Sequence, residues 1–220
     1  MRLKTIFLLL LLVSTAAQAK TLVFWPRIAD QVPAAMKNLK SGDHVVFQSG
    51  TYRLNHGILL EGLEDVVIEG KGGVNLIVTD LNDDVIALES CSRIQVKGLR
   101  ARHETPADDY RCEGAVIRCR NSQKLFIAEN HLNGCGASGV FAMSSKDIVI
   151  YKNHIFNNTY AGVWLQDASA TVHRNKIYDN ASALITYGKC GVSLTDNTIE
   201  SNGGNIYYDT AYFRLMTGER

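Results

Sequence analysis

The sequence predicts an all-β fold in which short coils stack on one another. The main observation is an asparagine that returns at a nearly fixed interval: Asn130, Asn153, Asn175 and Asn197 lie 23, 22 and 22 residues apart. An aliphatic residue stands three positions before each asparagine and another stands two positions after it. A fixed period of ~20 to 50 residues is typical of stacked-repeat proteins.

Each repeat contains three short apolar runs with the alternation of β-strands, and none leaves room for a long helix. We therefore interpret each repeat as one coil of three strands that pairs in parallel with the coils on either side. Equivalent residues of neighbouring coils then lie ~4.8 Å apart. The asparagines would form a ladder at one bend, where their amides satisfy backbone polar groups.

Residues 1–19 have the three parts of a secretory signal peptide. The segment starts with two basic residues, continues with an apolar run at 6–13, and ends with small residues at Ala17 and Ala19. The alternative is a membrane anchor, but the run is shorter than the ~20 apolar residues that a span needs. We expect cleavage after Ala19 and export to the periplasm or the cell exterior. The mature chain, 20–220, would form one domain without a transmembrane segment.

A short amphipathic helix is expected at about residues 29–40, just before the first coil. Val32, Ala35, Met36 and Leu39 have helical spacing, and a Ser-Gly pair follows them. The open end of a coil stack is an unpaired sheet edge that needs a cover. We therefore interpret this helix as a cap, with an ordinary surface helix as the alternative.

Two parts of the sequence resemble the right-handed parallel β-helix proteins of the pectin-lyase-like superfamily. They are the ladder "NHL", "NHI", "NKI", "NTI" and the stretch "SGDHVVFQSGTYRLNHGILLEGLEDVVIEG" at residues 41–70. The resemblance covers residues 41–209. It implies a single-stranded right-handed parallel β-helix of about seven coils with an N-terminal capping helix. It does not define an activity, because the superfamily hosts lyases, hydrolases, epimerases and non-enzymatic binders.

The charge of the chain is almost balanced. It has 23 Lys and Arg residues against 22 Asp and Glu residues, for a net charge of +1. This balance does not suggest a nucleic-acid partner, and it leaves the oligomeric state open.

The resemblance implies that ligands bind along the outer face of the first strand of each coil. Within such a strand, alternate residues point inward and outward. One expected outward line consists of Arg118, Phe141 and Trp164. The line beside it consists of Arg120, Met143, Gln166 and Tyr187.

Exposed aromatic side chains suit the apolar faces of sugar rings. We therefore expect Phe141, Tyr160, Trp164, Gln166 and Tyr187 to bind a polysaccharide. The alternative is that the aromatic residues pack against one another and only stabilise the sheet.

A charged excursion at residues 103–113 lies at the upstream edge of this line. Loops of this kind in a compact repeat are usually functional or disordered. Cleavage of an acidic polysaccharide would require a carboxylate partner, a base and an acid. Arg118 or Arg111 could serve as base or carboxylate partner, and His103 as acid or base.

The same excursion offers oxygen ligands for a metal. Asp108 and Asp109 could bind Ca²⁺, but acidic pairs in loops are also ordinary turn formers. His131 and His154 stand one coil apart and could hold a metal too. Their column continues as Lys176, which is more typical of an exposed row.

Two cysteines stand at equivalent positions on adjacent coils. Cys112 lies five residues before Ile117, and Cys135 lies five residues before Val140. Stacked positions ~4.8 Å apart fall within the Cα separation that a disulfide needs. We expect a Cys112–Cys135 disulfide, with two free thiols as the alternative.

The sequence thus predicts an exported protein that binds an acidic polysaccharide and, if it is an enzyme, cleaves it as a lyase or hydrolase. The alternative is a carbohydrate-binding or structural repeat protein of the cell envelope without catalysis. The paired-aspartate and Gly-His-Gly motifs of polygalacturonases are absent, as is the Asp-Pro-His-Asp motif of alginate epimerases. The sequence therefore leaves catalysis open.

Overall fold

The structure, a computed structural model, describes residues 19–104, 113–133, 137–204, 207–208 and 214–217. Most of the predicted signal peptide lies outside these ranges. Five residues with predicted roles also lie outside the described residues, namely Asp108, Asp109, Arg111, Cys112 and Cys135. Their roles stay predictions.

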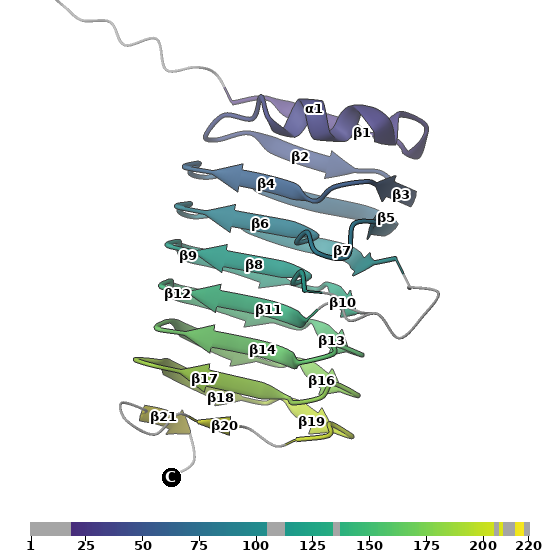
Figure 1. Cartoon of the computed structure of the whole chain (residues 1–220). Helices are drawn as coiled ribbons and strands as arrows, with labels where there is room; N and C mark the ends of the chain where they lie inside the picture. The colour runs from purple at the N-terminus through teal and green to yellow at the C-terminus, as the bar shows by residue number, and fades with distance from the viewer. Residues whose placement is uncertain (1–18, 105–112, 134–136, 205–206, 209–213, 218–220) are drawn as a thin grey trace, which may run out of the picture.

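The chain winds into a parallel β-helix of about seven coils (Figure 1). The first strands of the coils form a sheet of seven strands among the described residues, called here the first-strand sheet, which faces the viewer in Figure 1. Its strands are β4 (Ile58–Glu61), β6 (Ile86–Glu89), β8 (Ile117–Arg120), β11 (Ser138–Met143), β14 (Ala161–Gln166), β17 (Leu184–Tyr187) and β20 (Tyr207–Tyr208).

The second and third strands of the coils form one larger sheet, fourteen-stranded in the described part of the chain. We call the second strands of the coils the second level and the third strands the third level. β5 (Val67–Val78) and β7 (Gln95–His103) are long strands that include both levels, whereas each later coil has two separate strands there. The second-level strands are β1 (Thr21–Phe24), β2 (His44–Phe47), β9 (Gln123–Ala128), β12 (Lys146–Tyr151), β15 (Ser169–His173), β18 (Gly191–Thr195) and β21 (Arg214–Thr217). The third-level strands are β3 (Gly50–Leu54), β10 (His131–Asn133), β13 (His154–Phe156), β16 (Lys176–Tyr178) and β19 (Thr198–Glu200).

The asparagine ladder joins the coils as predicted. Asn153 Oδ1 accepts hydrogen bonds from the backbone N–H and the side-chain Nδ2 of Asn130, at 3.0 and 3.1 Å. Asn153 Nδ2 donates to Ile127 O at 2.8 Å and to Asn175 Oδ1 at 3.1 Å. Because the amide is fully buried, it satisfies backbone groups that water cannot reach.

A second ladder, not predicted, runs at the end of the third strands. Asn158 Nδ2 donates to Asn180 Oδ1 at 2.8 Å, and Asn180 Nδ2 donates to Asn202 Oδ1 at 3.0 Å. These asparagines also recur every 22 residues. The two ladders fix the coil register at two corners.

A left-handed residue precedes each asparagine of the first ladder. Glu129, Lys152, Arg174 and Asp196 have φ between 52° and 58°, a region that non-glycine residues rarely adopt. In the preceding coil the equivalent position is occupied by Gly98, with φ 73°. A Cβ added to Gly98 would lie 2.5 Å from Gly70 O. The close approach of the two backbones therefore requires glycine there.

The interior of the stack is one continuous hydrophobic cluster. Ile117, Val140, Val163 and Leu184 stack in register from β8 to β17, and all four are fully buried. Full burial of such a side chain is worth ~1.5–3 kcal/mol. The inward columns therefore supply the main driving force, and the outward columns are free for other roles.

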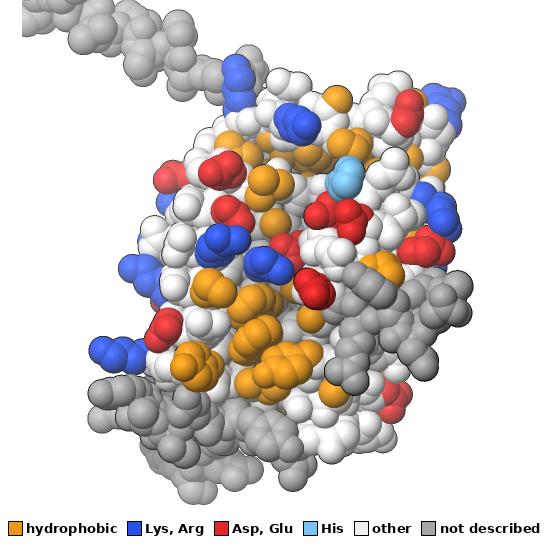
Figure 2. Space-filling view, in the orientation of Figure 1, with side chains coloured by type: hydrophobic (Ala, Val, Ile, Leu, Met, Phe, Trp, Pro, Cys, Tyr) orange, Lys and Arg blue, Asp and Glu red, His pale blue; other side chains and the backbone are white. Residues whose placement is uncertain are grey.

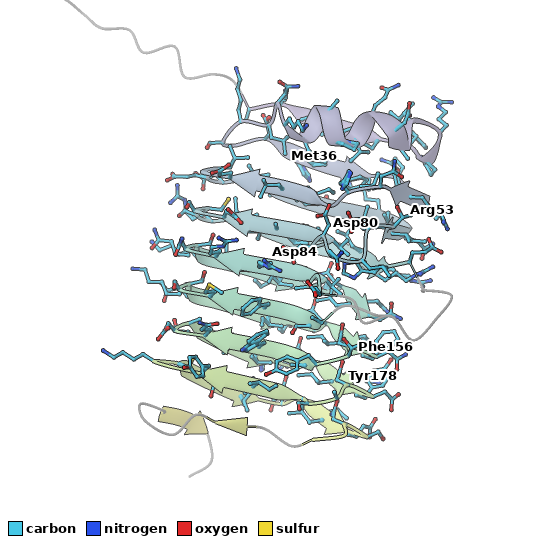
Figure 3. All side chains as sticks on the ribbon, in the orientation of Figure 1. Met36, Arg53, Asp80, Asp84, Phe156 and Tyr178 are labelled. Carbon is cyan, nitrogen blue, oxygen red and sulfur yellow. The ribbon has the colours of Figure 1, made fainter. Side chains whose placement is uncertain are left out.

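The one helical region of the described residues lies at the N-terminal end of the stack (Figure 1). It consists of a 3₁₀ segment, Pro26–Gln31, and α1, Val32–Met36. It therefore begins and ends earlier than the predicted 29–40. Val32 and Met36 are buried in the core cluster, and Figure 3 shows Met36 on the side of α1 that meets the coil below. The position agrees with a cap, and the capping role stays a prediction.

None of the helices in the described part of the chain is both long and apolar enough to cross a membrane. The described cysteines, Cys91, Cys119 and Cys190, are buried free thiols. Cys112 and Cys135 lie outside the described residues, so the disulfide between them stays a prediction. Ile117 and Val140, which follow these cysteines by five residues, pair in register.

Asn153→Ala should lower the free energy of unfolding by ~3 kcal/mol, because it leaves several buried backbone and amide groups without hydrogen-bond partners. Urea denaturation followed by circular dichroism would measure the change.

Asn75→Ala is the matched control. Asn75 is partly exposed and its side chain makes one long bond, 3.4 Å from Nδ2 to Thr51 Oγ1. We expect its stability to change by no more than ~0.5 kcal/mol. Equal losses in the two variants would contradict the structural role of the ladder.

Candidate functional site

The outward surface of the first-strand sheet, called here the first-strand face, carries the predicted line of side chains. Arg118 pairs in register with Phe141, and Phe141 pairs with Trp164. The residues on either side of each point into the core. The structure therefore brings these three residues together, while their roles stay predictions.

The aromatic residues of this line form a compact group. The rings of Phe141 and Trp164 stack with centroids 4.1 Å apart and an interplanar angle of 14°. Tyr160 meets Trp164 edge-on, with centroids 4.8 Å apart. We call Phe141, Tyr160 and Trp164 the aromatic patch. Hydrophobic side chains gather over β11 and β14 in Figure 2.

The accessibility of the aromatic patch differs between its members. Phe141 is 8% exposed because its neighbours cover it, whereas Tyr160 is 45% exposed. In the next column Met143, Gln166 and Tyr187 are in register, and Tyr187 is 55% exposed. The exposed rings of Tyr160 and Tyr187 and the partly exposed Trp164 are thus the contact surface available to a ligand.

Arg118 begins the line on the upstream side and already has a partner. Its Nη2 lies 2.9 Å from Asp84 Oδ1, and its guanidinium lies 5.7 Å from the centre of the Phe141 ring. Burial raises the pKa of Asp84, although Arg118 and the N–H of Ala115 both favour the ionised carboxylate. A ligand carboxylate at Arg118 would have to compete with Asp84.

A second ion pair and a pocket lie beside the ion pair of Arg118 and Asp84. Arg120 Nη2 is 3.0 Å from Glu89 Oε1. Asp83, Asp84 and Glu89 line a pocket of about 280 Å³ between β4 and β6. The upstream part of the first-strand face is therefore ionic, and the downstream part is aromatic.

Three buried N–H donors on this face lack hydrogen-bond partners in the described structure. They are Arg118 Nε, Arg120 Nε and Trp164 Nε1. Buried polar groups without partners are uncommon in folded proteins. All three atoms are buried beneath the surface of the face, so they are not open to a ligand as they stand.

His103 lies near this end of the face but points into the fold. It is fully buried, and its Nε2 lies 2.6 Å from the carbonyl oxygen of Asp83, to which it donates. Burial lowers the pKa of His103. The predicted acid or base role would require access to a ligand, which the described surroundings of His103 do not provide.

The rest of the predicted catalytic and metal set lies outside the described residues. Arg111, Asp108 and Asp109 belong to the excursion between Glu104 and Glu113. At its start, Glu104 pairs with Arg53 at 2.7 Å, and at its end the N–H of Glu113 donates to Leu81 O at 3.1 Å. The predicted Ca²⁺ site stays a prediction.

Sequence reasoning missed the acidic partners of the two arginines. Asp84 and Glu89 belong to the coil above Arg118 and Arg120, and the excursion at 103–113 lengthens that coil. The 22-residue period therefore does not link these positions. Aligning "DVIALES" with "AVIRCRN" would have placed Glu89 opposite Arg120, but it places Asp84 opposite Ala115 and does not reveal the pair with Arg118.

A different outward column, on the third-level strands, contains the paired histidines. His131 and His154 stack with centroids 4.6 Å apart and an interplanar angle of 11°, between Arg100 and Lys176. Stacked rings present their faces to each other and not their nitrogen lone pairs, so the geometry does not suit a shared metal. Burial lowers the pKa of both imidazoles, helped by His154 and Arg100 at His131 and by Lys176 at His154.

The stacked coils define a solenoid whose first-strand face has an ionic end and an aromatic end. The family described as the right-handed β-helix region matches residues 56–214. The chain therefore belongs to the right-handed β-helix proteins of the pectin-lyase-like superfamily, as the sequence predicted. No curated protein matches the sequence.

Solved structures share the fold at low sequence identity. A proposed glycosyl hydrolase from Parabacteroides merdae has a TM-score of 0.50 and 13% identity, covering 88% of this chain and 86% of that chain. The Dettilon tailspike protein has a TM-score of 0.51 and 12% identity, covering 88% of this chain and 48% of that chain. At such identities the likeness shows the fold alone.

Stability should fall as the pH drops below the ordinary imidazole pKa of 6.5. The folded pKa values of His131 and His154 are lowered, so the unfolded chain takes up protons first and is favoured in acid. Replacing both residues, His131→Phe and His154→Phe, keeps two stacked rings but removes the two groups that bind protons in acid. We expect the Tm difference between pH 7.5 and pH 5 to shrink by on the order of 2 °C.

The control is His173→Phe, because His173 stacks on Tyr151 and lies beside Asp196 rather than beside a second histidine. A double variant with the same acid sensitivity as the unmodified chain would contradict the role of the pair.

Proposed function

We propose that the first-strand face binds a polysaccharide. The observation that carries this proposal is the aromatic patch, which spans adjacent coils and borders Gln166 and Tyr187 in the next column. Aromatic rings bury the apolar faces of sugars. The amide of Gln166 and the hydroxyls of Tyr160 and Tyr187 offer hydrogen bonds to sugar hydroxyls.

A polymer suits this face better than a single sugar. Equivalent side chains repeat at the strand spacing of ~4.8 Å, so a ligand that lies along the stack meets one row of side chains after another. One of the similar structures, with a TM-score of 0.50, is a proposed glycosyl hydrolase. That likeness supports the fold, and the aromatic patch supports the ligand class.

The charges of the face favour a neutral chain over the acidic chain expected from the sequence. Both arginines are already paired, Arg118 with Asp84 and Arg120 with Glu89. Further carboxylates, from Glu61 and Asp83, lie at the same end. A polyuronate would meet like charges there, which reduces affinity.

Binding is better supported than cleavage. Arg118 is engaged by Asp84, and His103 is buried. Among the described residues, the predicted catalytic groups therefore do not converge on an open point of the face. We propose a carbohydrate-binding protein that acts outside the cytoplasm, with export by residues 1–19.

Trp164→Ala should weaken polysaccharide retention by about tenfold or more, because a central aromatic contact typically carries ~2 kcal/mol of binding energy. Affinity electrophoresis in gels that contain neutral glucan or mannan, pectate or alginate would measure it. We expect neutral chains to be retained more strongly than the two polyuronates.

Phe156→Ala is the matched control. Phe156 stacks on Tyr178 with centroids 4.9 Å apart, in an equivalent ladder on the third-level strands (Figure 3). Retention that survives Trp164→Ala but is lost with Phe156→Ala would place the ligand elsewhere. New unsaturated ends, detected by ultraviolet absorbance, would show cleavage and overturn the proposal of binding alone.

A further inference from the structure

Three side chains from the turns of two adjacent coils meet at the upstream edge of the first-strand face. His56 precedes β4, and Asp80 and Asp83 lie in the turn between β5 and β6. His56 Nδ1 lies 2.8 Å from Asp83 Oδ2 and 3.6 Å from Asp80 Oδ2. One nitrogen and two carboxylate oxygens thus lie within 4.8 Å of one another. Figure 2 shows a histidine side chain next to acidic side chains in the upper part of this face, and Figure 3 labels Asp80 on the turn before β6.

The backbone holds this group in place. His103 donates to Asp83 O at 2.6 Å, and Asn82 N–H donates to Asp80 Oδ1 at 3.0 Å. A Cβ at Gly57 would lie 1.7 Å from Asp84 O, and one at Gly114 would lie 1.9 Å from Asp83 O. The turn is therefore clamped between the coils above and below it, and its carboxylates are positioned before any ligand arrives.

The charge balance of the group favours a cation. Asp84, the next residue along the turn, pairs with Arg118. Among the ion pairs of the described residues, Asp80 and Asp83 have His56 as their cationic partner and no lysine or arginine. Two carboxylates that close repel each other unless a cation lies between them.

The donor set indicates the class of cation. Imidazole nitrogen suits Zn²⁺, Fe²⁺ and Ni²⁺, and carboxylate oxygen alone suits Ca²⁺ and Mg²⁺. We propose that His56, Asp80 and Asp83 bind a divalent transition-metal ion of the Zn²⁺ type. The side chains of His56, Asp80 and Asp83 are 72%, 38% and 41% exposed. Water or an oxygen of a ligand can therefore fill the remaining coordination positions.

The ion would lie next to the pocket that Asp83 and Glu89 line. The three proposed ligands are other residues than the predicted Ca²⁺ ligands Asp108 and Asp109, which lie outside the described residues. The proposal does not depend on polysaccharide binding.

Isothermal titration of the tag-free full chain with ZnCl₂ tests the proposal. We expect one saturable site per chain, a rise in Tm with Zn²⁺, and affinity that falls by at least about tenfold with His56→Ala or Asp83→Asn. Replacing Zn²⁺ with Co²⁺ should give visible absorption bands that also disappear in His56→Ala.

His44→Ala is the matched control, because His44 Nε2 also lies 3.1 Å from a carboxylate oxygen, that of Glu69. Unlike Asp80 and Asp83, Glu69 already pairs with two lysines, Lys71 and Lys97. This variant should bind Zn²⁺ as the unmodified chain does. The proposal is overturned by no saturable binding in the unmodified chain, or by equal loss in His44→Ala. It is also overturned by Ca²⁺ binding that survives His56→Ala, which would indicate a site made of carboxylates alone.

Discussion

The buried amide ladder is the interaction on which the rest of the structure depends. Parallel coils leave backbone N–H and C=O groups at every bend, and water does not reach those on the inside. Asn130, Asn153 and Asn175 bond to the backbone of one neighbouring coil and to the amide of the next. Sliding one coil by a single residue would break these bonds and would also turn the apolar columns outward.

Every outward feature follows from this fixed register. Because Phe141 must lie above Trp164, their rings stack; because β6 must lie above β8, Asp84 reaches Arg118. The first-strand face is consequently divided into an ionic end near the helix and an aromatic end farther along the stack. The two ends therefore present different chemistry on one continuous surface, charged at one end and aromatic at the other.

The sequence was sufficient for those parts of the molecule that repeat. The coil, the ladder and the line from Arg118 to Trp164 follow from period and alternation, which depend on neighbours at constant spacing. The acidic end was missed because the coil with the excursion at 103–113 is longer, so spacing no longer identifies vertical neighbours. His56 and Asp83 meet across irregular turns, and His103 proved buried because β7 continues through the third level. Side-chain direction in such segments depends on tertiary packing rather than on local pattern.

Disulfide trapping tests the register most directly. Val149, Thr171 and Ser193 occupy one outward column on three successive coils. Cysteines introduced as Val149→Cys and Thr171→Cys should cross-link on mild oxidation, because neighbouring strands lie ~4.8 Å apart. The pair Val149→Cys and Ser193→Cys, two coils apart at ~9.6 Å, should not. Peptide mapping would identify the bonds, and a cross-link in the second pair but not in the first would contradict the stacked register.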